Sequence, residues 1–134
     1  ATRENLDEYI ENTEEAIREF FGVTDVKCIL ILNPAEPPVM MQTSVTCVLD
    51  DYRLSAIQNE LQKIELLMNR SVPGYRIVTE PTEVSANKIF CSVQVEGRGD
   101  YLPSYAGNLD IINCAAIHMA ELIAAEQPDV AAVS

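Results

Sequence analysis

The segment GRGDYLPSYAG, from Gly97 to Gly107, combines glycines, a guanidinium group and three hydroxyl groups in one short loop. Glycine amides that lead into a helix N-terminus can bind an anion such as a phosphate group. The segment matches neither GxxxxGK[ST] nor GxGxxG, and it carries the carboxylate of Asp100. We therefore interpret it as a structural connection between a strand and a helix. The alternative is a nucleotide or other anion site that uses Arg98, Tyr101, Ser104 and Tyr105.

The single histidine lies one helical turn after a cysteine, as Cys114 and His118. A pair at this spacing can act as thiolate and base, or as half of a zinc site. The four cysteines are far apart, form no CxxC pair and lie in apolar periodic segments: Cys28, Cys47, Cys91 and Cys114. We expect them to be reduced and to pack as small hydrophobic residues in a reducing compartment, with no metal site, no cofactor and no catalytic residue.

Glutamates repeat every three or four residues along the first predicted helix: Glu4, Glu8, Glu11, Glu15 and Glu19. Like charges at this spacing repel each other, so the stripe lowers the stability of the helix. One interpretation is a solvated helix face. The other is a docking surface for a basic partner, for instance a protein surface that normally holds nucleic acid.

The chain has 134 residues, of which 48% are hydrophobic, and a net charge of -12. This length fits one globular domain, and the negative charge disfavours binding to nucleic acid and to anionic membranes. We find no uninterrupted apolar run long enough to span a bilayer and no signal-peptide pattern. We expect a cytoplasmic protein, or one of the virion or host cytoplasm if its origin is viral.

Hydrophobic periodicity predicts seven elements in the order α-β-β-α-β-β-α. These are a helix that follows a candidate N-cap at Thr2 and ends at Phe21, strands over 26–32 and 43–49, a helix over 54–68, strands over 75–80 and 88–95, and a helix over 108–126. The order predicts an α+β fold in which two hairpins form a four-stranded antiparallel sheet covered by helices. We expect one domain over residues 1–127 and a frayed tail over 128–134.

The predicted fold leaves more apolar surface than one small sheet can cover. The strand over 26–32 is apolar on both faces, and the last helix is apolar over most of its circumference. Subunit contacts would cover this surface. We therefore predict a homo-oligomer, either a dimer or a larger ring, whose interface includes Ile29, Ile31, Ile111 and Leu122.

In the order of its elements the chain resembles type III secretion chaperones and phage tail terminators, which are small, acidic and oligomeric. This resemblance implies helices over a hairpin-rich sheet and a role in assembly. We find no constellation of residues that requires an enzyme, and we predict a non-enzymatic protein-binding or assembly protein. It would be chaperone-like, phage-structural-like or an acidic inhibitor. The alternative is a small-ligand-binding protein or enzyme that uses the Gly97–Gly107 loop.

Overall fold

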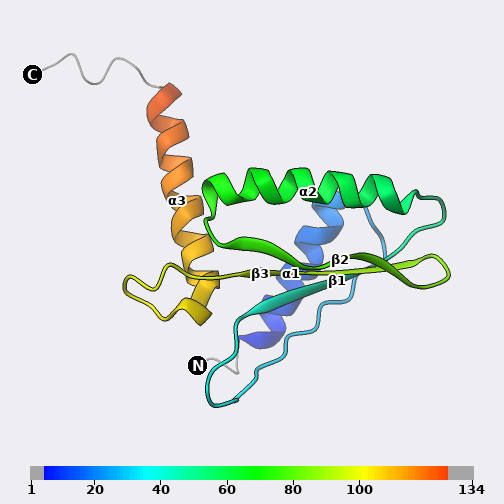
Figure 1. Cartoon of the computed structure of the whole chain (residues 1–134), viewed down its shortest axis with the longest axis horizontal. Helices are drawn as coiled ribbons and strands as arrows, with labels where there is room; N and C mark the ends of the chain where they lie inside the picture. Colours follow the sequence, from blue (N-terminus) through cyan, green and yellow to red (C-terminus); the bar gives the residue numbers. More distant parts are fainter. Residues whose placement is uncertain (1–4, 127–134) are drawn as a thin grey trace, which may run out of the picture. The chain divides into compact units, whose positions relative to one another are not determined.

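The computed structural model describes residues 5–126, which form three helices and a three-stranded antiparallel sheet of the α+β class (Figure 1). The elements are α1 (Leu6–Phe21), β1 (Gln42–Val48), α2 (Leu54–Ser71), β2 (Tyr75–Ser85), β3 (Lys88–Val95), the short 3-10 helix η1 (Ser104–Ala106) and α3 (Gly107–Glu126). Glu4 and the predicted tail over 128–134 lie outside the described residues. Residues 1–36 and 37–134 form two compact units, and each is described by itself.

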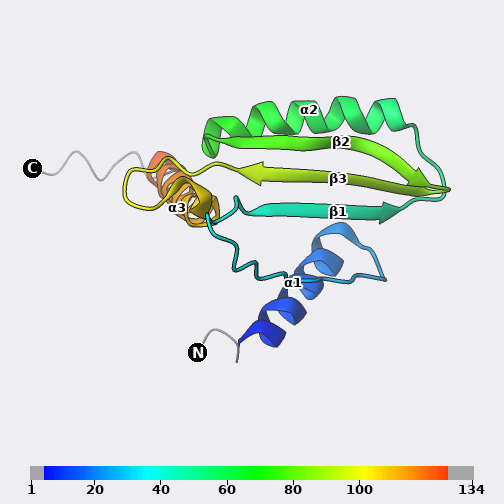
Figure 2. The same cartoon turned by 60° about the horizontal axis from the view of Figure 1, so that its bottom comes forward.

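The sheet has the strand order β1-β3-β2, so β3 is central and the other two strands are its edges (Figure 2). β1 pairs with β3 in a regular antiparallel register that places Val45 opposite Cys91. The pairing of β2 with β3 is interrupted by irregularities along β2. The central position of β3 agrees with its burial, since Ile89, Ser92 and Val95 are all buried.

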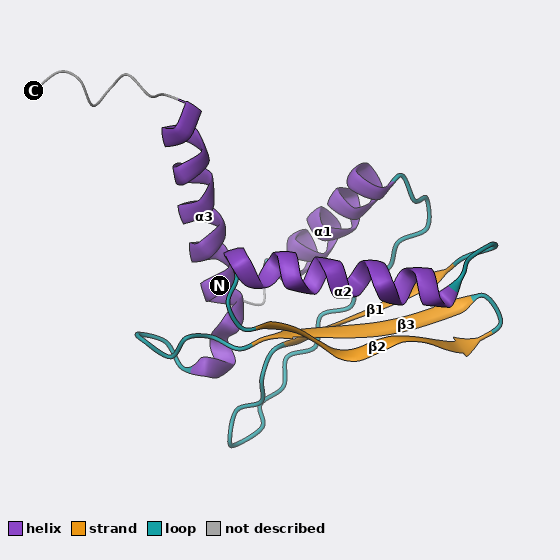
Figure 3. Cartoon of the chain, turned by 45° about the horizontal axis from the view of Figure 1, so that its top comes forward, coloured by secondary structure: helices purple, strands orange, loops and turns teal. Residues whose placement is uncertain are grey.

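Helix α2 runs along the sheet and contacts β2 (Figure 3). The sequence predicts a packing seam at helical spacing on this helix, and most of the seam is half-buried: Leu54, Ile57, Leu61 and Met68. The buried Val72 follows the helix and leads into β2. Around Val72 and β3 the apolar core of this unit is small, which leaves many large hydrophobic side chains exposed.

The prediction of a fourth strand over Val26–Leu32 is wrong for the single chain. The segment forms no ladder, and the side chains of Ile29 and Ile31 are 74% and 80% exposed. Branched residues make a segment suitable for a strand, but a strand also needs a neighbour that pairs with its backbone groups. The observed order is therefore α-β-α-β-β-α, with one hairpin rather than two.

Helix α3 begins against the sheet and is exposed over most of its length. Residues 104–126 are long and apolar enough to cross a membrane, judged by length and composition alone. This finding corrects the expectation that no segment would pass such a test. A core helix of a soluble protein passes the same test, so the composition shows only that α3 is predominantly apolar.

Candidate functional site

The outer edge of β2 is closed by polar side chains of α2. The N–H of Glu96 donates to Gly74 O at 3.1 Å, so Tyr75 and Ile77 direct their backbone groups away from β3. Two of these groups have a partner on α2, and Tyr75 N–H donates to Val72 O at 3.2 Å. Ile77 N–H donates to Glu65 Oε1 at 2.6 Å, and Tyr75 O accepts a hydrogen bond from Asn69 Nδ2 at 2.7 Å.

The closure continues further along β2. Pro81 is fully buried and has no N–H group to satisfy, and its carbonyl accepts a hydrogen bond from Gln58 Nε2 at 3.0 Å. The three α2 side chains share one face of the helix because Gln58, Glu65 and Asn69 are spaced by seven and four residues. A strand from another chain therefore finds no free row of backbone groups along this stretch of β2.

The outer edge of β1 is open. Leu49, directly after the strand, donates its N–H to Asn87 O at 2.9 Å, so the odd-numbered residues of this regular ladder face β3. The even-numbered residues direct their N–H and C=O groups outward: Gln42, Ser44, Thr46 and Val48. Within residues 5–126, β1 pairs only with β3, and all seven of its residues are exposed. Such an edge can accept another strand.

The exposed segment Val26–Leu32 belongs to the other unit and is tied to α1 near its start, where Arg18 Nη2 also donates to Val26 O at 3.5 Å. Glu14 Oε1 accepts a hydrogen bond from Cys28 N–H at 2.8 Å, and Glu14 Oε2 pairs with Arg18 at 3.0 Å. The Cys28 bond, with a further contribution from Arg18, lowers the pKa of Glu14. The contact fixes the start of the segment and leaves Ile29 and Ile31 exposed.

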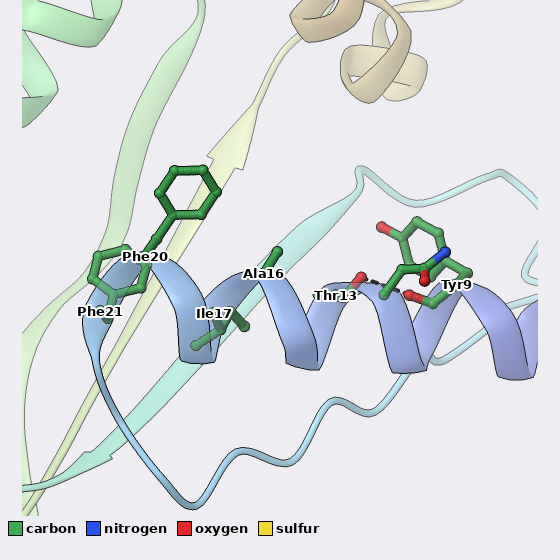
Figure 4. Close-up of a pocket in the computed structure, with 7 residues that line it drawn as sticks. Tyr9, Thr13, Ala16, Ile17, Phe20 and Phe21 are labelled. Atoms are coloured by element: carbon green, nitrogen blue, oxygen red, sulfur yellow. Dashed lines mark hydrogen bonds between the residues drawn. The ribbon is translucent and has the colours of Figure 1, made fainter.

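Helix α1 carries a shallow apolar hollow along one face, between Tyr9 and Phe21 (Figure 4). Phe20 and Phe21, at its C-terminal end, are 82% and 75% exposed. The glutamates described within the acidic stripe are exposed as well: Glu8, Glu11, Glu15 and Glu19. Their role as a contact for a basic partner stays a prediction.

The Gly97–Gly107 loop is folded onto the start of α3. Gly97 N–H donates to Ser104 O at 2.8 Å, and Arg98 N–H donates to Asp110 Oδ2 at 2.7 Å. The guanidinium of Arg98 pairs with Asp100 at 3.1 Å. Two carboxylates thus occupy the polar groups of Arg98, which favours the structural interpretation over an anion site.

The remaining side chains of the alternative ligand site line neither the hollow on α1 nor the small hollow between Tyr75 and Ile111. Tyr101 is fully exposed and Tyr105 is 40% exposed, while Ser104 contributes its backbone carbonyl to the loop. The ligand-binding role of these residues stays a prediction. Two close contacts explain the glycines at the ends of the loop. A Cβ on Gly97 would lie 2.8 Å from Asp110 Oδ2, and one on Gly107 would overlap Val95 O.

All four cysteines are free thiols. Cys91, on β3, is half-buried, and burial together with the nearby Cys47 raises the pKa of its thiol. Cys114 is half-buried on α3, whereas His118 is exposed. In the searched part of the chain, residues 5–126, no group of three or more His, Cys, Asp or Glu side chains is arranged to hold a metal ion.

Residues 1–103 match the family described as prokaryotic acetaldehyde dehydrogenase, dimerisation. The chain belongs to this family. Its relatives include the acetaldehyde dehydrogenases of Pectobacterium atrosepticum, 50% identical over 123 residues, and of Spirochaeta aurantia, 51% identical over 121 residues. That of Geobacillus stearothermophilus is 43% identical over 125 residues. These alignments cover 92%, 90% and 92% of the chain but only 41%, 40% and 42% of the relatives. The chain thus spans about two fifths of their length.

Membership in the acetaldehyde dehydrogenase dimerisation family overturns the main functional prediction. The chain is related to part of an enzyme, so the predictions of a non-enzymatic assembly protein, a chaperone-like or phage-structural-like protein and an acidic inhibitor are wrong. The resemblance to chaperones and tail terminators rested on element order, which does not determine function. The broader alternative, which included an enzyme, agrees better with the family.

The prediction of self-association agrees with the family, because its description names dimerisation. The relatives are bacterial enzymes, which is consistent with the predicted cytoplasmic location and not with a phage origin. Sequence reasoning missed the residues that close the β2 edge. Their signal was present: the polar residues Gln58, Glu65 and Asn69 recur on one face of a helix beside its apolar seam.

Proposed function

We propose that the chain joins two subunits of an acetaldehyde dehydrogenase into a homodimer. The observation that carries this proposal is the match of residues 1–103 to a dimerisation family, a stretch that contains α1, α2 and the whole sheet. In this proposal the chain supplies subunit contacts, and the dehydrogenase activity named in the relatives belongs to the assembled enzyme.

Two exposed features support a contact surface of this kind. The first is the open β1 edge, whose outward backbone groups a strand from the second subunit would satisfy. The second is the apolar segment Val26–Leu32, where the exposed side chains of Ile29 and Ile31 would leave water on association. A second chain that covers either feature would remove unpaired backbone groups or apolar side chains from water.

The proposal is tested by the molar mass of the purified chain, measured by light scattering on a sizing column at low and high salt. We expect about twice the chain mass of 14.8 kDa at both salt concentrations. The contact is apolar and made of backbone groups, and salt screens the repulsion between two chains that each carry -12 charges. A mass of one chain at both salt concentrations would refute the proposal.

A variant pair locates the surface. Replacing Ile29 and Ile31 by Asp places two charges on the exposed segment, and we expect it to give the single-chain mass. The control replaces Leu66 and Leu67 by Asp on α2, where the side chains are 71% and 60% exposed. This control should keep the mass of two chains. A mass of two chains for the Ile29 and Ile31 variant would remove these residues from the interface.

A further inference from the structure

Two of the four cysteines lie on neighbouring strands of the sheet, Cys47 on β1 and Cys91 on β3 (Figure 2). In the antiparallel register, Cys47 stands opposite Ile89 and Val45 stands opposite Cys91. Opposite residues of such a pair carry their side chains on the same face of the sheet, and so do residues two apart along one strand. The side chains of Cys47 and Cys91 are therefore diagonal neighbours on one face.

The two thiols differ in their access to solvent. Cys47 is exposed on the edge strand, whereas Cys91 is half-buried on the central strand, where Ile89 is buried. Both thiols are free, and the influence of Cys47 on the pKa of the Cys91 thiol agrees with their close placement. A small ion can thus reach the pair from the Cys47 side, and Cys91 is partly shielded from water.

The diagonal arrangement does not favour a disulfide. Diagonal neighbours on adjacent strands have Cα atoms about 7–8 Å apart. Disulfides usually join Cα atoms about 4.4–6.8 Å apart, and a wider pair is joined only if the backbone moves. The regular ladder between β1 and β3 opposes such a movement. A metal ion between the two sulfurs spans a wider gap, because two metal–sulfur bonds of about 2.3 Å in a line place the sulfurs about 4.6 Å apart, against about 2 Å in a disulfide.

The ligands present determine which ion can bridge the pair. Thiolates are soft ligands that select ions such as Cu(I) and Zn²⁺. A structural zinc site takes four ligands, but among residues 5–126 no group of three or more His, Cys, Asp or Glu side chains could hold a metal ion. Cu(I) is a soft ion that forms stable complexes with only two thiolates, one on each side of the ion. The pair therefore fits Cu(I) better than Zn²⁺.

We propose that Cys47 and Cys91 form a two-thiolate site for a soft monovalent metal ion, Cu(I). On binding, each thiol releases one proton and its sulfur forms one bond to the ion, with no change in oxidation state. The bound ion links the edge strand β1 to the central strand β3 through side chains, in addition to the backbone ladder. This site does not depend on the proposed function, because it uses side chains on a sheet face rather than the outward backbone groups of β1.

The test measures the Cu(I) affinity of the reduced 134-residue chain in the absence of oxygen, by competition with the chelator bathocuproine disulfonate. Two double variants that keep the same number of thiols are compared, one with Cys47→Ser and Cys91→Ser and the other with Cys28→Ser and Cys114→Ser. We expect one tightly bound ion per chain in the wild type and in the Cys28 and Cys114 variant. The Cys47 and Cys91 variant should bind Cu(I) at least about 100-fold more weakly, since loss of a residue that only supports a metal ligand already costs about 10–100-fold.

The melting temperature gives a second readout that needs only one exposed residue to be changed. Cu(I) should raise the melting temperature of the wild-type chain, because an ion held between β1 and β3 binds the folded state better than the unfolded state. Cys47→Ser should fold as the wild type does, since Cys47 is exposed, and its melting temperature should not respond to Cu(I). Cys114→Ser is the control and should respond as the wild type does.

Three results would overturn the inference. Equal Cu(I) affinities of the two double variants would show that Cys47 and Cys91 are not the ligands. One ion per two chains would place thiols of two copies on the ion. Rapid formation of a Cys47–Cys91 disulfide with oxidised glutathione would identify a redox pair in place of a metal site. The molar mass of the metal-free chain tests the proposed function separately, so failure of the one does not imply failure of the other.

Discussion

The two edges of the sheet differ in how their outward backbone groups are satisfied. At β2, the side chains of Glu65, Asn69 and Gln58 bind the groups that face away from β3, and Pro81 lacks the N–H group that would need a partner. At β1, no such helix lies beside the strand in its own unit, and all seven residues are exposed. The first edge is closed by side chains of its own unit along residues 75–81, and the second is exposed.

The difference shows how a small sheet can direct its own association. An edge strand with free N–H and C=O groups can pair with any other edge, including an incorrect one. Closing β2 with side chains of α2 removes one of the two choices. Along residues 75–81 of β2 the edge is then closed to a second chain, so the proposed dimer would extend the sheet at β1 without a large charged interface.

The largest expected effect concerns the turn that starts the closed edge. Gly74 has a φ of +92°, and a Cβ at this position would lie 2.2 Å from Glu96 O. Gly74→Ala should therefore lower the free energy of unfolding by about 3 kcal/mol, measured by urea denaturation. The control is Gly99→Ala, with a φ of +76° and open space around it, which should lose only about 1 kcal/mol. Equal losses would show that the contact with Glu96 is unimportant.

The next largest effect is expected when the closed edge of β2 is disrupted. Glu65→Ala removes the acceptor of Ile77 N–H and should lower the free energy of unfolding by about 1.5 to 3 kcal/mol, since the lost hydrogen bond involves a charged group. Glu60→Ala on the same helix removes only an exposed pair with Lys63 and should cost less than about 1 kcal/mol. If the two variants unfold at the same urea concentration, the β2 edge does not depend on Glu65.

The open edge is tested by Thr46→Pro, which removes an outward N–H but takes no hydrogen bond from the ladder with β3. We expect the dissociation constant of the dimer to rise about tenfold or more, measured by analytical ultracentrifugation. The stability of the dissociated chain should change little. Thr46→Val keeps the N–H and serves as the control, with wild-type association expected. If Thr46→Pro is unfolded in dilute solution, the Thr46 N–H takes part in the fold of the single chain rather than in the dimer contact.

The smallest effect concerns the shorter of the two hydrogen bonds that tie the exposed segment to α1. The bond from Cys28 N–H lowers the pKa of Glu14 from its ordinary value of 4.5. A group whose pKa falls on folding contributes stability above its ordinary pKa, and this contribution is lost as the pH falls through the lowered value.

The Glu14 titration can be followed by NMR through the Cys28 amide, and we expect a midpoint below 4.5. Glu14→Gln should abolish this titration, whereas Glu15→Gln, at an exposed position on the same helix, should leave it unchanged. A midpoint at or above the ordinary value would contradict the assigned bond.

Much of the fold follows from local pattern. The strand over Lys88–Val95 has the predicted bounds and the first helix ends at Phe21 as predicted, because periodicity and a glycine stop signal are properties of the segments themselves. The helix begins at Leu6, later than an N-cap at Thr2 would place it. β2 is longer than predicted, since Pro81 indicates a connection when taken alone. At an edge closed by Gln58 the missing N–H of Pro81 costs nothing, and the strand continues.

The rest depends on partners that local pattern does not specify. Val26–Leu32 has the composition of a strand, but whether it forms one depends on which edge is available to it. The family is likewise not visible in any short motif, because a dimer contact needs exposed apolar and backbone groups rather than a fixed set of catalytic residues. The excess of apolar surface could be predicted, and the enzyme to which it belongs could not.

The most direct test of the two-edge account is amide hydrogen exchange, followed residue by residue in dilute and concentrated solutions of the chain. The account predicts that the amide of Ile77 is protected at both concentrations, because Glu65 binds it within the chain. The amides of Ser44 and Thr46 should exchange quickly in dilute solution and become protected only as the chain associates. Protection of Thr46 in the dilute single chain, or its absence in the associated form, would contradict the claim that β1 is the edge left open for the second subunit.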